Sequence, residues 1–413
     1  MSADLKTGLL GRTLSHSISP FLHEKLGDAA YRFFEIEPED LEVFLSSDVW
    51  DCLNVTIPYK QAVIPFCTAL TERAKAAGAV NVLLKKDGKL YGDNTDVEGF
   101  RALVDGIDFV ARKTVILGKG GAAHMARAVC LEKGASEVLF VSRSGEVTFS
   151  DTAHYCDAEI LVNATPVGMY PNTEESPVDL SRFTKLKHVV DLVANPLRTT
   201  LCLEAESRGI DARGGLLMLA VQAHEAQCVF RGKTPLLTRR KLYQEALSHS
   251  LHVVLVGMPG CGKTTLGKRL SEELSLPFFD TDALIEEKAG CTIPELFRAK
   301  GEAYFREMET QVLRELSAAD ACIVATGGGA VLKDENRRLL KQNGLVVHLD
   351  CPVEELSREG RPLSVDAQAV EHMAREREPF YRAARDLHFS FSKRETDVGA
   401  RLFKQIKTHL EEL

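Results

Sequence analysis

A glycine-rich segment just past the middle of the chain constrains its fold more than any other feature. Residues 257–264 fit the spacing G-x-x-x-x-G-K-T and follow the apolar run 252–256, which is typical of a β-strand. A loop of this kind, between a strand and a helix, wraps its backbone N–H groups around phosphates. We therefore expect an ATP or GTP site in which Lys263 reaches the outer phosphates and Thr264 holds Mg²⁺. The residues expected to line this site are Gly257, Met258, Pro259, Gly260, Cys261, Gly262, Lys263, Thr264 and Thr265.

Length, charge and cysteine usage limit the remaining possibilities. The chain has 413 residues, which is too long for one core and predicts two or three domains. Its net charge of -8 argues against a nucleic-acid partner. It has no apolar run that could span a bilayer and no signal-peptide pattern, so we expect a cytoplasmic protein that does not bind membranes. The ten cysteines lack any C-x-x-C pair, which favours reduced thiols over disulfides or a zinc site.

Strand-like and helix-like stretches alternate along nearly the whole chain, which is typical of α/β architecture. A polar helical stretch ends just before the apolar run 252–256, and we place a domain boundary near residue 248. The expected domains are therefore 1–247 and 248–413. A softer boundary lies between residues 94 and 99, ahead of a second glycine-rich loop.

Two carboxylates follow the second apolar strand of the later domain. Asp280 and Asp282 lie at the end of the run 278–280, and ligands of open parallel sheets bind at the carboxyl ends of strands. Asp280 would hold Mg²⁺ through water, and Asp282 would accept the proton of an attacking hydroxyl. Asp282 also fits a helix N-cap, a structural role that is compatible with catalysis.

Arginines and a triple glycine come further along the chain. Three successive glycines at 327–329 end an apolar strand, where they let a backbone approach a ligand closely. Arg306, Arg361 and Arg377 suit an acidic substrate and a phosphate transition state, because a guanidinium bonds two carboxylate or phosphate oxygens at once. Any one arginine is more often a surface charge, so this prediction depends on the ordered set.

That ordered set resembles shikimate kinase over essentially all of residues 250–413. The resemblance implies a P-loop α/β domain with a parallel sheet, like the nucleoside-monophosphate kinases, that uses ATP and Mg²⁺. It implies that Asp282 is the base and that Arg306 and Arg377 clamp the shikimate carboxylate. It also implies that Arg361 lies on a lid, meets the ATP phosphates and contributes to catalysis, although the segment 358–361 is short for such a lid. The implied shikimate ligands are Asp282, Arg306, Gly327, Gly328, Gly329 and Arg377.

The glycine turn of the first domain predicts a dinucleotide site. Gly118, Gly120 and Ala123 fit G-x-G-x-x-G/A between an apolar strand and a helical stretch. The next strand-like run ends at residues 142–144, where an NAD site would carry Asp or Glu. Arg143 instead offers a cation to a 2′-phosphate, which favours NADP over NAD. A surface role for this single arginine is the alternative.

Hydroxyl and charged side chains precede this glycine turn. Ser17 and Ser19 occupy alternate positions from which two hydroxyls reach one carboxylate, although a Ser-Pro helix entry explains the same residues. A lysine and an aspartate that converge on one alcohol can pass the proton that accompanies hydride transfer. Lys60 and Asp96 are the candidates, but spacing alone does not bring together residues that lie so far apart in the sequence.

The order of motifs over residues 5 to about 245 resembles shikimate dehydrogenase. The resemblance implies two lobes, a substrate lobe of residues 1–97 and 217–247 and a Rossmann NADP lobe of residues 98–216. It also implies that the helix carrying Gln222 folds back onto the substrate lobe. The matching segments are 16–20, 54–60, 78–81, 92–96, 118–123, 163–169, 195–196 and 215–222.

The same resemblance assigns roles to individual residues. Lys60 and Asp96 would be the catalytic pair. Ala194 departs from the family pattern, which usually carries Tyr there, so one substrate or cofactor contact is missing. The implied substrate ligands are Ser17, Ser19, Thr56, Lys60, Asn81, Asp96 and Gln222. The implied NADP ligands are Gly118, Gly120, Gly121, Ala122, Ser142, Arg143, Thr165, Gly215 and Met218.

The two resemblances converge on one metabolite, because the product of the first reaction is the substrate of the second. We expect an enzyme of aromatic amino-acid biosynthesis that reduces 3-dehydroshikimate with NADPH and phosphorylates shikimate with ATP. The alternatives are a quinate/shikimate dehydrogenase that uses NAD, another small-metabolite kinase, and a regulatory nucleotide-binding protein without turnover. The intact Lys60, Asp96, Lys263 and Asp282 argue against the last. The sequence predicts neither oligomeric state nor domain orientation.

Overall fold

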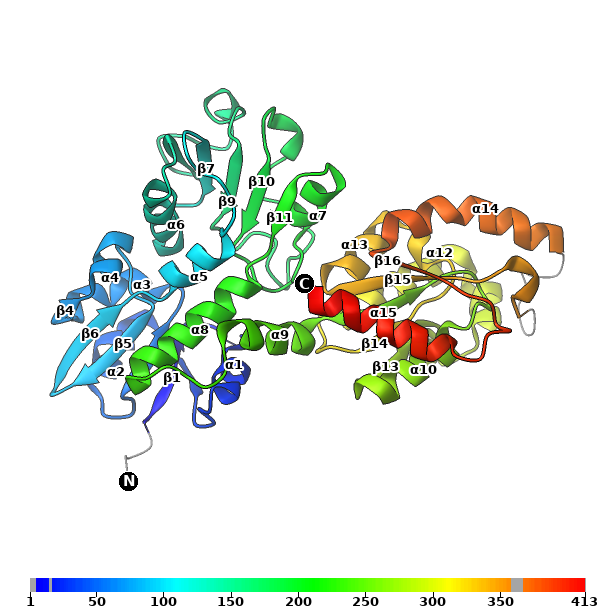
Figure 1. Cartoon of the computed structure of the whole chain (residues 1–413), viewed down its shortest axis with the longest axis horizontal. Coiled ribbons are helices and arrows are strands. Elements are labelled where there is room, and N and C mark those ends of the chain that lie inside the picture. The colour runs from blue at the N-terminus through cyan, green and yellow to red at the C-terminus, as the bar shows by residue number, and fades with distance from the viewer. Residues whose placement is uncertain (1–4, 15–16, 358–366, 413) are drawn as a thin grey trace. The chain divides into compact units, whose positions relative to one another are not determined.

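The chain forms two compact units (Figure 1). The computed structural model describes residues 5–14, 17–357 and 367–412. The first unit is Met1–Leu247 and the second is Ser248–Leu413. Both units consist of β-sheets whose strands are joined by helices, so the α/β class predicted from the sequence is confirmed.

A six-stranded sheet forms the first lobe of the first unit, in the order β2-β1-β3-β5-β6-β4. β1 pairs in parallel with β2 and β3, whereas β5 pairs antiparallel with both β3 and β6. The β5–β6 hairpin turns at Asp87 and Gly88, which both have positive φ, as tight hairpins require. The strands are β1 (Thr7–Gly11), β2 (Arg32–Glu35), β3 (Cys52–Val55), β4 (Ala69–Leu70), β5 (Val82–Lys86) and β6 (Lys89–Asp93).

Both faces of this sheet are buried. Because successive strand residues point to opposite faces, Leu53 belongs to a core around Trp50, whereas its neighbour Cys52 packs with Ala226 and Phe230. The last two residues lie on α8 (Leu216–Arg231), so this late helix covers the sheet made by the start of the chain. The other helices of the lobe are α1 (Ser19–Lys25), α2 (Leu41–Ser46), α3 (Tyr59–Ala62) and α4 (Glu72–Ala77).

A five-stranded parallel sheet forms the second lobe, in the order β11-β10-β9-β7-β8. The order reverses at β7, so the loops after β7 and β9 meet at the carboxyl edge, where open α/β sheets bind ligands. Phe100 and Met125 pack on one face with Ile116, and Tyr155 and Leu201 lie in the core of the other. The strands are β7 (Lys113–Leu117), β8 (Glu137–Val141), β9 (Ile160–Asn163), β10 (His188–Asp191) and β11 (Asp211–Arg213). The helices are α5 (Asp96–Leu103), α6 (Gly121–Glu132) and α7 (Thr200–Ser207), and α9 (Arg239–Ser250) follows α8.

The second unit contains a five-stranded parallel sheet in the order β13-β14-β12-β15-β16. All five residues of the central strand β12 are buried, which explains its uninterrupted apolar character. The chain order reverses beside β12, so the loop after this strand lies at a ligand-binding position of the sheet. The strands are β12 (His252–Val256), β13 (Phe278–Asp280), β14 (Ile323–Ala325), β15 (Gly344–Asp350) and β16 (Leu387–Ser390). The helices are α10 (Lys263–Leu274), α11 (Thr281–Ala289), α12 (Ile293–Leu316), α13 (Asp334–Gln342), α14 (Ala367–Ala384) and α15 (Val398–Glu412).

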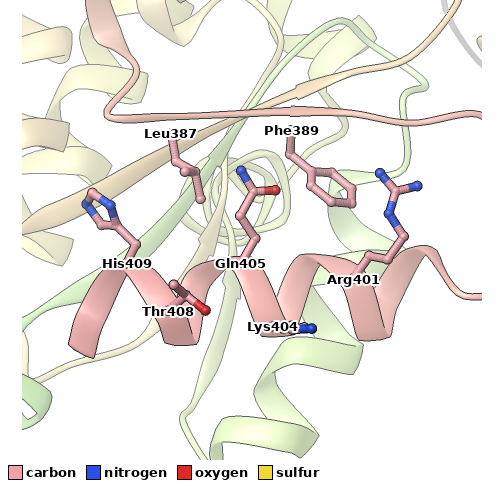
Figure 2. Close-up of a pocket in the computed structure, with 7 residues that line it drawn as sticks. All are labelled: Leu387, Phe389, Arg401, Lys404, Gln405, Thr408 and His409. Atoms are coloured by element: carbon pink, nitrogen blue, oxygen red, sulfur yellow. The ribbon is translucent and has the colours of Figure 1, made fainter. Parts of the chain in front are cut away.

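Side chains of α15 protect the edge strand β16. Figure 2 shows the shallow pocket between them, where Leu387 and Phe389 face residues of α15. Arg401 donates to the Ser390 carbonyl at 3.3 Å, and Gln405 donates to the His388 carbonyl at 3.3 Å. These bonds satisfy strand carbonyls that would otherwise invite pairing with another chain. The pocket therefore forms where α15 covers the edge of the sheet.

Two further findings concern the chain as a whole. Within the described ranges, no helix is long and apolar enough to cross a membrane. All ten cysteines lie in those ranges and are free thiols.

Candidate active sites

A lysine–carboxylate pair forms the centre of the first site. Lys60 Nζ lies 2.6 Å from Asp96 Oδ2, although the two residues come from α3 and from the first position of α5. The lysine side chain is 20% exposed and the aspartate 7%, so solvent reaches the pair mainly through the lysine. A partly buried ion pair with one accessible proton donor can exchange a proton with a bound substrate.

Asn81 connects this pair to two other elements. Its Nδ2 donates to Asp96 Oδ1 at 2.9 Å, to Thr95 Oγ1 at 3.0 Å and to Gln222 Oε1 at 3.4 Å. Gln222 lies on α8, so the late helix reaches the same cluster. The structure thus brings together Lys60, Asn81, Asp96 and Gln222, four residues that the sequence predicted as substrate ligands.

The remaining predicted substrate ligands lie outside this cluster of hydrogen bonds. Ser17 donates to Ser19 Oγ at 3.0 Å and also accepts from the Ser19 backbone N–H at 3.2 Å. α1 begins at Ser19, so the helix-entry role is present. Thr56 follows β3 and is half-buried. Across the described part of the chain, no side-chain hydrogen bond joins Ser17, Ser19 or Thr56 to Lys60.

The predicted dinucleotide turn lies against the loop after β9 and against the substrate lobe. Gly118 has φ of 101°, and a Cβ there would lie 3.2 Å from the Thr165 side chain, in the loop after β9. A Cβ at Gly120 would meet nothing within 4 Å, which leaves room for a ligand at the N-terminus of α6. Gly121 and Ala122 form the first turn of this helix, and a Cβ at Gly121 would lie 3.0 Å from Ala79 Cβ in the substrate lobe. The turn therefore faces the substrate lobe closely.

A second cation lies beside Arg143. The Arg143 side chain is exposed, and among the described residues it makes no hydrogen bond or ion pair. Lys119 donates from Nζ to the Ser144 carbonyl at 3.0 Å and to Ser144 Oγ at 2.9 Å. Ser142 is 7% exposed, and within the part of the chain that the structure describes its hydroxyl has no hydrogen-bond partner. Lys119 is a second cation that was not predicted from the sequence, although it lies inside the glycine motif.

Buried polar groups hold the loop that carries Thr165. Asn163 Oδ1 accepts from the Thr165 hydroxyl at 2.6 Å, and its Nδ2 donates to Asp191 Oδ1 at 3.0 Å. Burial raises the pKa of Asp191 to about 6, although bonds from Val193 N–H and Thr199 favour its charged form. Thr165 is thus held by a chain of bonds that ends in the core.

Gly215 and Met218, predicted along the cofactor, begin α8. Gly215 is its N-cap residue, and a Cβ there would lie 2.4 Å from the Leu192 carbonyl. Met218 is 7% exposed and packs in the core of the second lobe. A Cβ at Gly99 would lie 2.6 Å from the Met218 carbonyl, so α5 and α8 cross closely at this point.

The P-loop of the second unit holds its lysine with backbone groups. Lys263 is 8% exposed, and its Nζ donates to the Gly257 carbonyl at 2.9 Å and to the Met258 carbonyl at 3.0 Å. Gly257, Gly260 and Gly262 all have positive φ, which permits the tight wrap of the loop. α10 begins directly at Lys263, so its free N–H groups point into the loop.

The carboxylates of Asp280, the last residue of β13, and of Asp282, on α11, have different roles in the structure. Asp280 is the N-cap residue of α11 and accepts from the Asp282 backbone N–H at 3.1 Å. The cap therefore falls on Asp280, and Asp282 lies in the first turn of the helix. Thr264 donates to Asp280 Oδ2 at 2.7 Å, which joins the two predicted Mg²⁺ ligands. A Cβ at Gly327 would lie 2.7 Å from Asp282 Oδ1, so the triple glycine faces that carboxylate.

The arginines predicted for substrate binding contact the triple glycine. A Cβ at Gly329 would lie 2.7 Å from both terminal nitrogens of Arg306. Arg377 donates to the Gly328 carbonyl at 3.1 Å. The structure therefore gathers Asp282, Arg306 and Arg377 around one glycine segment. Arg361 lies outside the described residues.

Glu309 is a site residue that the sequence analysis missed. It is fully buried on α12, and its Oε2 accepts from Arg306 at 2.9 Å. Burial raises its pKa, and the Arg306 charge opposes that shift. The signal was its spacing, because residues three apart share a helix face. Glu309 orients the guanidinium toward the glycine segment.

Comparisons with known families agree with this geometry. Residues 9–83 match the family model described as the shikimate dehydrogenase substrate binding domain. Residues 259–410 match the family model described as shikimate kinase. Both resemblances inferred from the sequence are therefore confirmed.

Relatives extend the first match over the whole first unit. The shikimate dehydrogenase (NADP(+)) of Oleidesulfovibrio alaskensis is 36% identical over 265 residues, which are 58% of this chain and 95% of the relative. The crystal structure of shikimate dehydrogenase 1 from Peptoclostridium difficile is 33% identical, with a TM-score of 0.54 over 58% of this chain and 97% of that one. A chorismate mutase/shikimate 5-dehydrogenase fusion protein from Clostridium acetobutylicum is 30% identical, with a TM-score of 0.53 over 58% and 94% of the two chains.

Proposed function

The chain belongs to the shikimate dehydrogenase family and also carries a shikimate kinase domain, and we propose that its two units catalyse consecutive steps on one metabolite. The first unit reduces 3-dehydroshikimate to shikimate with NADPH. The second transfers the γ-phosphoryl group of ATP to a shikimate hydroxyl. The observation that carries the proposal is the Lys60–Asp96 contact of 2.6 Å, in a chain that also holds a complete P-loop.

We assign the proton chemistry of the first unit to Lys60 and Asp96. NADPH supplies the hydride when bound. Lys60 Nζ donates a proton to the carbonyl oxygen that becomes the alcohol, and Asp96 holds the amine in place and takes part in restoring its proton. Asn81 and Gln222 bind the ring hydroxyls, and Ser17 and Ser19 bind the carboxylate with Thr56 beside them.

The residues around the glycine turn fit NADP. The open space at Gly120 admits a pyrophosphate at the N-terminus of α6. Arg143 and Lys119 offer two cations at the end of β8, where a 2′-phosphate is recognised, and the Ser142 hydroxyl lacks a partner in the described ranges. These features support NADP over NAD. Gly118, Gly121, Ala122, Thr165, Gly215 and Met218 complete the proposed cofactor site.

The oxygen donors of the second unit fit Mg²⁺ and a phosphoryl group. Thr264 and Asp280 would hold the ion, since hydroxyl and carboxylate oxygens are its preferred ligands. Asp282 accepts the proton of the attacking shikimate hydroxyl, and Lys263 binds the outer phosphates. Arg306 and Arg377 bind the shikimate carboxylate beside the triple glycine, and Arg361 meets the ATP phosphates.

We also propose bounds for the lobes and domains and a cellular compartment for the chain. We assign residues 1–97 and 217–247 to a substrate lobe, 98–216 to the NADP lobe, and 248–413 to the kinase. The ten free cysteines support a reducing compartment, and we propose the cytoplasm.

Two half-reaction assays on the full chain test the proposed function. The first follows NADPH consumption with 3-dehydroshikimate and compares shikimate and quinate as substrates of the reverse reaction with NADP and NAD. The second follows ADP release from ATP and Mg²⁺ with shikimate or gluconate. We expect turnover of 3-dehydroshikimate and shikimate with NADP preferred. A preference for quinate with NAD, or binding without turnover, would overturn the proposal.

A further inference from the structure

The turn that carries Asp96 needs support from outside itself. Asp96 is the first residue of α5, and among the residues that the structure describes the N-cap residue Thr95 makes no side-chain cap bond. The turn follows β6, whose last residue is Asp93. Whatever fixes the backbone at Asp93 therefore fixes the direction in which the chain reaches Asp96.

The Asp93 carboxylate is held by four donors. Arg73 donates to its two oxygens from Nε and a terminal nitrogen, both at 2.6 Å. The Thr71 hydroxyl donates at 2.6 Å and the Asn94 backbone N–H at 2.7 Å. Burial alone would raise the pKa of Asp93, but the bonds from Arg73 and Thr71 outweigh burial and lower it below the ordinary value. A paired, two-point contact of this kind fixes orientation as well as charge.

The backbone of the same turn is tied to the segment around Asn81. The Asn81 N–H donates to the Asp93 carbonyl at 3.0 Å, and the Thr95 N–H donates to Asn81 Oδ1 at 2.6 Å. The Asn94 side chain donates to the Ala79 carbonyl at 2.8 Å. Because Asn81 also donates to Asp96, a shift at Asp93 is transmitted through Asn81 to the carboxylate that contacts Lys60.

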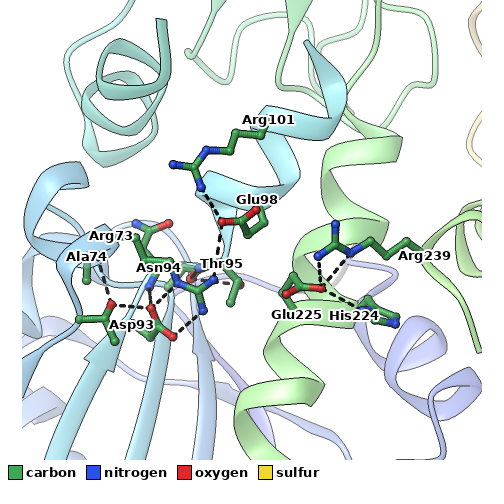
Figure 3. A network of polar contacts seen from close by, with 12 residues as sticks. Arg73, Ala74, Asp93, Asn94, Thr95, Glu98, Arg101, His224, Glu225 and Arg239 are labelled. Atoms are coloured by element: carbon green, nitrogen blue, oxygen red, sulfur yellow. Dashed lines mark hydrogen bonds and ion pairs between the residues drawn. The ribbon is translucent and has the colours of Figure 1, made fainter. Parts of the chain in front are cut away.

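Arg73 also belongs to a longer line of charges (Figure 3). One of its nitrogens lies 3.9 Å from Glu98 on α5, and Glu98 accepts from Arg101 at 2.6 Å. Arg101 in turn pairs at 2.6 Å with Glu132, the last residue of α6. The line therefore runs from the turn before Asp96 to the helix whose first residues form the dinucleotide turn.

We propose that Arg73 and Asp93 are positioning residues of the dehydrogenase, which set the Asp96 carboxylate against Lys60 for proton transfer. The inference rests on the proposed function of the first unit. Neither residue contacts the substrate in this account, since both act through the turn and through Asn81. The pair differs from an ordinary stabilising contact because its loss impairs turnover more than binding or folding.

Arg73→Lys is the main test, because it keeps the charge and removes the two-point contact. We expect kcat for 3-dehydroshikimate reduction to fall by roughly 10- to 100-fold, since small misplacements of a catalytic group have effects of that size. The KM values for 3-dehydroshikimate and NADPH should stay within about 3-fold, because substrate contacts are kept. Arg112→Lys is the matched control, since Arg112 also pairs with two carboxylates, Asp108 and Glu159, at the opposite end of β7.

A double-variant cycle separates positioning from structure. If Arg73 acts through Asp96, adding Arg73→Lys to Asp96→Asn should change kcat by less than about 2-fold, whereas independent effects would multiply. Emission of Trp50, the single tryptophan of the chain, reports folding of the first unit during heating. If Arg73→Lys does not fold, Asp93→Asn replaces it, because this change keeps the side chain's shape and one acceptor oxygen.

Each outcome decides the inference. The positioning role is supported if Arg73→Lys lowers kcat selectively, folds normally, and adds less than about 2-fold to the effect of Asp96→Asn on kcat. The positioning role is overturned if Arg73→Lys has normal kcat or if Arg112→Lys loses as much kcat. It is also overturned if the effects of Arg73→Lys and Asp96→Asn on kcat multiply fully. If Asp96→Asn itself kept full turnover, the proposed proton chemistry would fail as well, which distinguishes that result from failure of the positioning role alone.

Discussion

In the kinase unit the candidate site residues follow the ends of three adjacent strands of one sheet, whereas in the dehydrogenase unit they come from two sheets. Lys263 and the triple glycine come after β12 and β14, and Asp280 is the last residue of β13; these three strands are neighbours. Lys60 and Asp96 lie on helices that follow β3 and β6 of the first sheet of the other unit, and Gly118 follows β7 of the second sheet. The strand order of one sheet thus places the kinase site residues, whereas the dehydrogenase site also depends on how its two lobes pack.

The lysines of the two units show the same contrast. Lys263 is held by carbonyls of its own loop, so its position depends on local backbone geometry. Lys60 is held by a carboxylate from another element, whose position depends on Asn81 and Asp93 in turn. The dehydrogenase site should therefore be more sensitive to changes far from the chemistry than the kinase site.

The largest expected effect is reciprocal loss of the two activities. Lys60→Ala removes the proton donor and should lower reductase kcat by about 10³-fold, with kinase kcat unchanged. Lys263→Ala should do the reverse, because the outer phosphates lose their cation. Steady-state kinetics of both half-reactions on each folded variant provide the measurement. Loss of both activities in either variant would contradict two separate sites.

Metal removal should distinguish the activities of the two units without any mutation. Excess EDTA should lower kinase turnover by about 10²-fold or more, because the phosphoryl oxygens lose the Mg²⁺ for which we propose Thr264 and Asp280 as ligands. Reductase turnover should stay the same, since its proton chemistry uses Lys60 and Asp96. Restoring Mg²⁺ should restore the kinase. A metal-sensitive reductase would break the comparison.

Cofactor preference should depend on two cations of the dehydrogenase unit. The pair of changes Lys119→Ala and Arg143→Asp should lower the NADPH-to-NADH ratio of kcat/KM by roughly 10- to 100-fold, because each removes a charge-assisted bond to the 2′-phosphate. Binding of adenosine 2′,5′-bisphosphate against AMP, measured by calorimetry, checks the same point without turnover. Lys133→Ala, beyond the far end of α6, is the control. An unchanged ratio would show that both side chains act elsewhere.

The triple glycine of the kinase unit should tolerate no side chain near Arg306. A Cβ in Gly329→Ala would displace the guanidinium, which lies 2.7 Å away, so KM for shikimate should rise by about 10-fold while KM for ATP stays constant. Gly120→Ala offers the contrast, since its Cβ meets no protein atom within 4 Å. That variant should fold normally and weaken only the nicotinamide cofactor. Equal effects of Gly329→Ala on both kinase substrates would contradict the assignment of Arg306.

Acid should destabilise the kinase unit more than the dehydrogenase unit. Burial lowers the pKa of His252 and of His348 to about 4, so unfolding takes up protons below pH 6.5 and stability is lost as the pH falls toward 4. From pH 7 to pH 5 the two histidines together should remove roughly 4 kcal/mol from the kinase unit, and Glu309, whose pKa is raised by burial, should offset part of that loss.

In the dehydrogenase unit, two buried groups with shifted pKa values have opposite effects on stability as the pH falls. Burial lowers the pKa of His23 to about 3, but the pKa of Asp191, raised to about 6, contributes stability that is present at low pH and lost as the pH rises through 6. The net loss in this unit from pH 7 to pH 5 should be about 1 kcal/mol or less. Trp50 emission follows this unit during urea unfolding, and residual kinase activity follows the other. A steeper acid loss in the Trp50 signal would contradict this balance.

The sequence predicted the kinase site more completely than the dehydrogenase site for a physical reason. Ligand residues at the ends of parallel strands follow apolar runs that can be read directly, as with Asp280 after residues 278–280. The Lys60–Asp96 contact could not be derived from spacing, because it depends on tertiary packing, and only family resemblance suggested it. Lys119, Glu309 and Asp93 were missed because their partners come from other elements or from the next turn of a helix.

Mixing two single variants tests the central claim, that one chain holds two complete and separate sites for consecutive steps. Lys60→Ala and Lys263→Ala are combined in equal amounts with 3-dehydroshikimate, NADPH, ATP and Mg²⁺, and mass spectrometry follows phosphorylated shikimate. We predict product from the mixture and from the unaltered chain, and none from either variant alone. Absence of product from the mixture, while the unaltered chain forms it, would contradict the account.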